Sequence, residues 1–90
     1  MTKLELIMTV SELTGLTKKQ SENAVNMVFE NIQTALSKGD KVQIVGFGTF
    51  DVRIRPAHQG RNPQTGEAVQ ILQTKVPYFK AGKTLKEAIR

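Results

Sequence analysis

The residues of this 90-residue chain that are best suited to chemistry are cations beside a rigid turn. Arg53 and Arg55 alternate with apolar neighbours, so at a period of two they share one face of a strand. A few residues later comes the segment 61–66 (Arg-Asn-Pro-Gln-Thr-Gly), in which Pro63 fixes φ and Gly66 can take a positive φ. Guanidinium groups and a rigid apolar tip bind partners without covalent chemistry, so the pattern predicts a binding surface.

Two strand-like stretches, 50–55 and 68–74, flank this turn and predict a β-hairpin arm. The arm has few large apolar side chains, and an isolated two-stranded ribbon is marginal in water, so we expect a partner to order it. The minor groove of DNA suits such an arm, because its negative potential attracts arginine and an apolar wedge such as Pro63 can enter a base step. An ordinary exposed hairpin, in which the proline only sets the turn, is the alternative.

The composition argues against several other kinds of site. There is no cysteine and only one histidine, which leaves no disulfide, thiolate metal site or all-histidine metal site. The sequence has no phosphate-binding glycine loop and no histidine within a nucleophile motif, so we expect no enzyme, cofactor or small-molecule substrate. No apolar run reaches the length of a membrane span, and the N-terminus lacks the pattern of a secretory leader, which predicts a cytoplasmic protein.

The net charge of +5 is unevenly distributed along the chain. Residues 1–45 carry five lysines and five acidic residues, whereas residues 46–90 carry eight lysines and arginines and three acidic residues. An excess confined to one half indicates an anionic partner, with nucleic acid favoured over an anionic membrane surface. A solvated basic face with no partner is the other interpretation that charge alone allows.

Two helices are predicted to precede the arm. Thr2 with Glu5, and Thr17 with Gln20, have the spacing of capping boxes that open helices. Gly15 is expected to close the first helix, and the second should end near residue 38. Together they predict a helix hairpin.

The remainder of the chain predicts a small antiparallel sheet and a third helix. A Gly-Phe-Gly turn at 46–48 joins the predicted strand 41–45 to the strand that leads into the arm. A third capping box, Thr84 with Glu87, predicts a short C-terminal helix. The expected fold is α+β in a single domain: a helical base (1–38), a three-stranded sheet saddle (41–55 and 75–80), a β-ribbon arm (56–74) and a C-terminal helix (84–90).

A second copy of the chain is expected to complete the core. About seventy residues remain for the core once the arm is set aside, which is few for a monomer without disulfides or metal. Apolar residues of the second helix spread over roughly 200° of its surface, more than one packing face requires. Phe47, at the turn, is a candidate to enter the partner subunit. The alternative is that the first helix and the sheet cover the second helix completely.

The order of these features along the whole chain resembles that of the bacterial HU-type histone-like proteins, in the family that includes integration host factor. The resemblance is carried by Gly15-Leu16-Thr17-Lys18-Lys19, the segment 38–42 leading into the 46–48 turn, the 61–66 arm tip and the segment 76–83. It implies an intertwined homodimer whose two arms embrace double-stranded DNA through the minor groove. It also implies that Pro63 intercalates between base pairs and kinks the duplex. Whether the chain also forms a heterodimer with a related subunit is left open by the sequence.

The resemblance also assigns residues to these roles. The expected DNA-binding residues are Lys3, Arg53, Arg55, Arg61, Asn62, Pro63, Gln64, Lys75, Lys80, Lys83 and Lys86. The resemblance places Phe47, Phe50 and Phe79 in the dimer core, and the wide apolar surface of the second helix adds Val28, Phe29 and Ile32.

Three departures from the family pattern bear on the arm and the sheet. His58 and Gln59 stand where basic residues are usual, which weakens the attraction of the arm for phosphates. Leu72 and Ala81 stand where proline is common. Because leucine has a backbone N–H, the returning strand of the arm is expected to pair more regularly than in relatives that have proline at this position.

The leading hypothesis is an architectural protein of the nucleoid that binds and bends DNA with little sequence preference and compacts or stabilises it. One alternative is a sequence-preferring DNA bender like integration host factor, although the arm tip is more similar to that of HU. Another is a basic module that binds RNA or serves in assembly, and such a module would not need Pro63 as a wedge.

Overall fold

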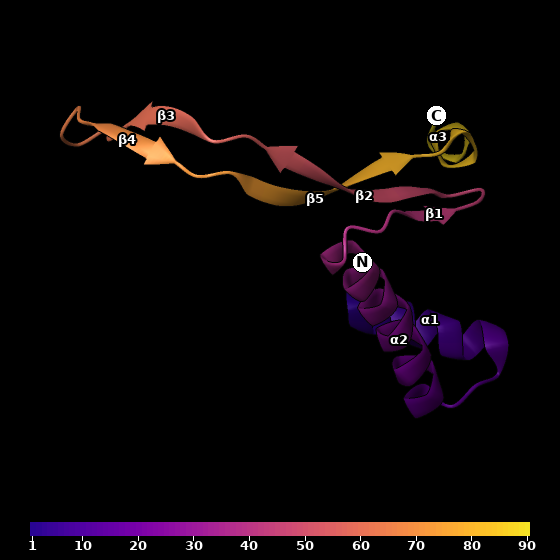
Figure 1. The fold of residues 1–90 in the computed structure, drawn as a ribbon. Helices are drawn as coiled ribbons and strands as arrows, with labels where there is room; N and C mark the ends of the chain where they lie inside the picture. Colours follow the sequence, from indigo (N-terminus) through magenta and orange to yellow (C-terminus); the bar gives the residue numbers. More distant parts are fainter. The chain divides into compact units, whose positions relative to one another are not determined.

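The computed structural model describes all residues, 1–90, and forms two compact units, Met1–Thr34 and Ala35–Arg90. The elements in chain order are α1 (Lys3–Thr14), α2 (Lys18–Ser37), β1 (Val42–Ile44), β2 (Gly48–Arg55), β3 (His58–Arg61), β4 (Ala68–Ile71), β5 (Thr74–Ala81) and α3 (Lys83–Ile89) (Figure 1). This arrangement confirms the predicted α+β class. None of the three helices combines the length and the hydropathy needed to span a bilayer.

Both predicted N-terminal helices begin at the expected caps. The Glu5 N–H donates to Thr2 Oγ1 over 3.2 Å, which satisfies one of the orphan donors of α1. Thr17 and Gln20 form a reciprocal capping box at the start of α2, in which each backbone N–H donates to the other side chain, over 3.0 and 3.1 Å. These bonds are local, which is why the sequence pattern predicts them correctly.

The ends of the two helices also follow the prediction. The Gly15 N–H donates to the carbonyl of Ser11, which closes α1. Gly39, with φ +82°, closes α2 in a Schellman motif: its N–H donates to Leu36 and the Asp40 N–H donates to Ala35. Within Met1–Thr34 the buried residues are Ile7, Val25 and Ser21, so the helical base has a very small core of its own.

The predicted three-stranded antiparallel sheet is present, in the order β1-β2-β5. A tight turn joins β1 to β2, with the Phe47 N–H donating to the Ile44 carbonyl over 3.0 Å. Beyond this sheet, β3 and β4 form a second, two-stranded ladder (Figure 1). The strand that leads into the arm therefore pairs with β5, to which the stretch 68–74 contributes only Thr74, opposite Arg55.

The two ladders nevertheless form one ribbon in a single register. Arg55 pairs with Thr74, and three residues further along each strand His58 pairs with Ile71. The interruption contains Pro56, which has no N–H to donate, on one strand and Leu72 on the other. Leu72 lies outside both strands and is 72% exposed, so the ladder is interrupted at this residue. Pro56 on the facing strand explains the break, because it has no backbone N–H to donate to the ladder. The backbone N–H of Leu72 does not replace that missing donor.

Three phenylalanines cluster on one face of the sheet. The Phe79 ring centroid lies 4.7 Å from that of Phe50 and 5.3 Å from that of Phe47, and both pairs are tilted. Gly48 is buried beneath this cluster. A Cβ at position 48 would lie 2.5 Å from Phe79 Cζ and 2.6 Å from the Lys80 carbonyl oxygen, so only glycine fits.

The C-terminal helix begins one residue earlier than predicted. Its N-cap is Gly82, without a side-chain cap, so the expected capping box of Thr84 and Glu87 is wrong. The Gly82 N–H donates to the Phe47 carbonyl over 2.8 Å. This hydrogen bond to the β1–β2 turn fixes the residue at which α3 begins. A local sequence pattern does not reveal it, because the donor and the acceptor are far apart in the sequence.

Candidate nucleic-acid interface

The ribbon has a cationic face and an apolar face. Because side chains alternate along a strand, the unbroken register places the odd-numbered residues of β2 and β3 on one face. Arg53, Arg55 and Arg61 therefore share that face, and Lys80 of β5 joins them through its pairing with Thr49. The opposite face of the sheet carries most of its large apolar side chains: Val42, Ile44, Phe50, Val52, Ile54 and Phe79.

The arm tip is a compact loop held by its own hydrogen bonds. The Asn62 N–H donates to the Glu67 carbonyl over 2.8 Å, and the Gly66 N–H donates to the Asn62 carbonyl over 2.7 Å. Asn62 Oδ1 accepts from the Gln64 N–H over 2.9 Å, which is an Asx turn. Gly66 has φ +75°, a conformation that residues with a Cβ rarely adopt. Asn62 thus shapes the loop, in addition to any contact that it makes with a partner.

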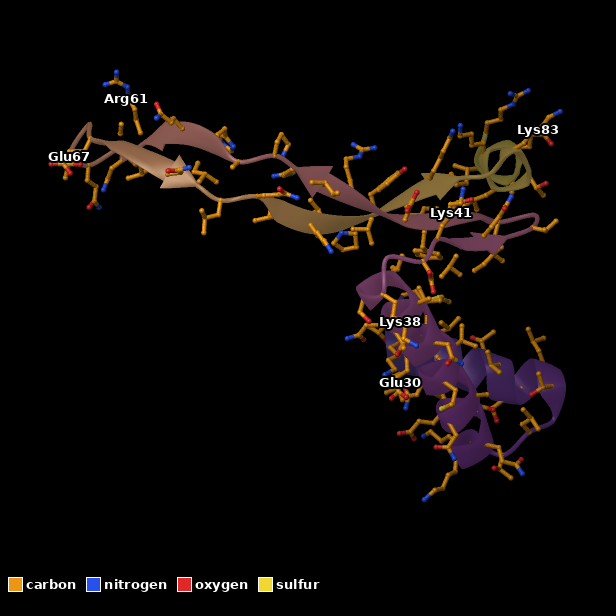
Figure 2. The ribbon with its side chains drawn as sticks, viewed as in Figure 1. Glu30, Lys38, Lys41, Arg61, Glu67 and Lys83 are labelled. Carbon is orange, nitrogen blue, oxygen red and sulfur yellow. The ribbon has the colours of Figure 1, made fainter.

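One candidate cation, Arg61, and one candidate wedge, Pro63, remain accessible at this tip. Pro63 is exposed, and no hydrogen bond of the loop depends on its side chain. Arg61 Nη1 donates to the Gly66 carbonyl over a long 3.4 Å, so the guanidinium braces the loop while it stays exposed. Figure 2 shows Arg61 pointing away from the ribbon beside the tip. The structure therefore brings together Arg61, Asn62, Pro63 and Gln64, as the sequence predicts.

Arg53, at the base of the arm, lies over an aromatic ring. Its Cζ is 4.2 Å from the centroid of the Tyr78 ring, which is the geometry of a cation–π interaction. Sequence reasoning missed Tyr78, although its position two residues before Lys80 places it on the cationic face. The alternation of β5 is the signal that could have identified it.

The predicted lysines divide into separate groups. Lys80 lies near the end of β5, and Lys83 and Lys86 lie on the short helix that follows. Lys83 forms the only ion pair of the chain, an exposed contact with Glu87 at 4.0 Å. Lys75 does not join this group, because it pairs with Ile54 near the arm and belongs to the apolar face. Lys3 lies in the first turn of α1, within the other compact unit.

The predicted dimer-core residues are apolar side chains that their own chain leaves partly uncovered. On α2, Val28 is 54% exposed and Phe29 is 49% exposed, and Ile32 is half-buried. In the sheet, Phe47 and Phe79 are 44% and 38% exposed. Large exposed apolar groups on both units are typical of surfaces that another subunit covers.

Comparisons with known proteins place this chain in a family. The family model described as "Bacterial DNA-binding protein" matches residues 1–90, and the chain belongs to that family. Among its relatives is the protein named DNA-binding protein HU of Geobacillus stearothermophilus, which is 57% identical over 90 residues and is matched over the full length of both chains.

Solved structures agree with this assignment. The fold is similar to the Anabaena HU–DNA cocrystal structure, with 46% identity and a TM-score of 0.91, covering 99% of this chain and 97% of that chain. It is also similar to HU from Thermotoga maritima, with 38% identity and a TM-score of 0.73 over the full length of both chains. The predicted resemblance to the HU family is thereby confirmed.

Proposed function

We propose that this protein is an architectural DNA-binding protein that binds and bends double-stranded DNA with little sequence preference. In this proposal the cationic face of the ribbon follows the minor groove, and Pro63 enters a base step and kinks the duplex. Its place in the cell would be on nucleoid DNA, which it would compact or stabilise.

The single observation that carries this proposal is the alignment of Arg53, Arg55 and Arg61 on one face of a ribbon that ends in an exposed proline. A row of guanidinium groups neutralises phosphates without selecting bases. The family and the HU relatives, one of them crystallised with DNA, support duplex DNA as the partner.

The salt dependence of binding tests the cationic face. Arg55→Gln removes one charge from that face, so the variant should release fewer counterions when it binds. We expect weaker binding to every duplex sequence, and a slope of log K against log salt that is flatter by about 0.9. Fluorescence anisotropy with a labelled random-sequence duplex over a salt series measures both quantities.

Lys18→Gln is the matched control, because Lys18 is an exposed cation in the first turn of α2, outside the ribbon. Its salt slope should equal that of the wild type. An unchanged slope in Arg55→Gln would remove Arg55 from the interface.

Competition experiments separate this function from its alternatives. Unlabelled duplexes of different sequence should compete equally, whereas one strongly preferred sequence would identify a site-selective bender. Double-stranded RNA should compete poorly, because its minor groove is wide and shallow and gives a wedge little purchase. Equal competition by RNA would favour a general polyanion-binding module.

The proposal includes a homodimer, because the apolar groups on α2 and on the sheet need cover. If folding is coupled to association, the melting temperature should rise with protein concentration, since each tenfold increase contributes about 1.4 kcal/mol. Phe29→Ala should lower the melting temperature and shift the chain toward monomer in sedimentation equilibrium.

Leu13→Ala serves as the control for this experiment. Leu13 is 82% exposed, more than Phe29, but it lies outside the predicted dimer core. We expect it to change neither the association state nor its concentration dependence. A concentration-independent melting temperature in the wild type would contradict coupled folding and association.

A further inference from the structure

We propose that Tyr78 is a positioning residue that holds the Arg53 guanidinium on the cationic face at the base of the arm. This inference rests on the proposed function, because it specifies how one cation of the DNA-binding face is oriented. It assigns a role to the only tyrosine of the chain, on a strand of the sheet rather than in the arm.

The register explains how the two side chains meet. Tyr78 of β5 pairs directly with Asp51 of β2, and Arg53 lies two residues further along β2 on the same face. Tyr78 and Arg53 are therefore diagonal neighbours across the ladder, at a separation that long and aromatic side chains can span. The 4.2 Å distance from Arg53 Cζ to the ring centroid places the cation against the π face, where the ring quadrupole attracts it.

Asp51, the only acidic residue of the three-stranded sheet, lies on this face but forms no ion pair with the cation. Its Oδ1 accepts a hydrogen bond from the Val52 N–H over 2.8 Å. A carboxylate partner would have cancelled much of the positive charge of Arg53. The ring instead restrains the guanidinium and leaves its charge available to an anion.

Restraint by a ring has a specific consequence for phosphate binding. A long arginine side chain loses conformational entropy when it is fixed by a ligand, and this loss weakens binding. Contact with the half-buried Tyr78 ring restricts Arg53 before the ligand arrives, while its N–H groups make no hydrogen bond within the chain. Arg55 and Arg61 have no aromatic ring against them, so Arg53 alone among the three is held in this way.

A double-mutant cycle tests the coupling. Tyr78→Leu removes the π face and keeps an apolar side chain of substantial size, and Arg53→Gln removes the cation. In the wild-type background Tyr78→Leu should weaken binding to a random-sequence duplex about two- to fivefold at low salt. In the Arg53→Gln background Tyr78→Leu should have no further effect on binding. Tyr78→Phe, made in the wild-type background, should bind like the wild type because it keeps an aromatic ring against Arg53.

Arg55→Gln provides the matched control for the cycle, because Arg55 lies on the same face without a ring partner. Tyr78→Leu should cost the same two- to fivefold in the Arg55→Gln background as in the wild type. Circular dichroism and melting temperature establish that each variant remains folded before binding is compared.

Two measurements without DNA observe the pair directly. Tyr78 dominates the intrinsic fluorescence, because the chain has no tryptophan. Arg53→Gln removes the guanidinium that covers one face of the Tyr78 ring, so quenching of this fluorescence by neutral acrylamide should increase. In NMR spectra the Arg53 side-chain protons beside the ring should be shifted upfield relative to those of Arg55. That difference should disappear in Tyr78→Leu.

The outcomes distinguish this inference from the function on which it rests. If the wild type does not bind duplex DNA, the proposed function fails and this inference fails with it. If the wild type binds DNA but Tyr78→Leu costs the same in the presence and absence of Arg53, the function stands and the positioning role is overturned. Loss of the upfield shift together with a coupled loss of binding supports the inference.

Discussion

Replacing Pro63 with alanine is expected to abolish the preference of this protein for a nicked duplex over an intact one. A nick lowers the cost of bending, which is of order 1–6 kcal/mol for a continuous duplex, so a kinking protein should bind the nicked form at least about tenfold more tightly. Pro63 is exposed at the tip, and the loop around it is held by hydrogen bonds of other residues. The variant should therefore keep its arm and lose only the wedge.

A salt-controlled gel shift with one duplex, intact and with a central nick, measures this preference. Pro77→Ala is the matched control, because Pro77 is an exposed proline of β5 in the sheet, far along the ribbon from the tip. It should retain the preference of the wild type. If Pro63→Ala also retains it, the tip proline only shapes the loop and the kinking mechanism is wrong.

Gly48→Ala is expected to destabilise the protein by about 2 kcal/mol, which corresponds to a melting temperature lower by roughly 10 °C in a chain of this size. The added Cβ would lie 2.5 Å from the Phe79 ring and 2.6 Å from the Lys80 carbonyl oxygen. The backbone atom moves only if the β2–β5 ladder distorts, and the ring moves only if the aromatic cluster with Phe47 and Phe50 loosens. Thermal unfolding at a fixed protein concentration measures the change.

Gly60→Ala provides the same substitution in a different setting. A Cβ at position 60 would lie 2.8 Å from Ile71 Cδ1, which is the end of a flexible side chain and can move aside. We expect a change in stability within about 1 kcal/mol, partly because alanine restricts the unfolded chain. Equal effects at the two positions would mean that Gly48 is not under the steric constraint described above.

Sequence reasoning succeeded where the determining interactions are local. The caps at Thr2 and Thr17 depend on residues three positions away, and the Asn-Pro turn depends on its own backbone preferences. It also placed Arg53 and Arg55 on one face, because strand alternation needs no knowledge of the partner strand.

It failed where a distant segment decides the structure. The start of α3 depends on a hydrogen bond from Gly82 to Phe47, thirty-five residues earlier in the numbering of this chain. Side chains on opposite strands of the sheet meet only through the pairing of β2 with β5, in which Arg55 faces Thr74. The contact between Arg53 and Tyr78 depends on that same pairing, so an inspection of either strand alone does not reveal it.

The single register of the ribbon also limits how such an arm can change its length during evolution. Insertion or deletion of one residue in one strand would turn every side chain beyond it to the opposite face and carry Arg61 away from Arg53 and Arg55. An unequal change in the two strands would require a bulge. Arms of different length that keep this arrangement should therefore differ by the same even number of residues on each strand.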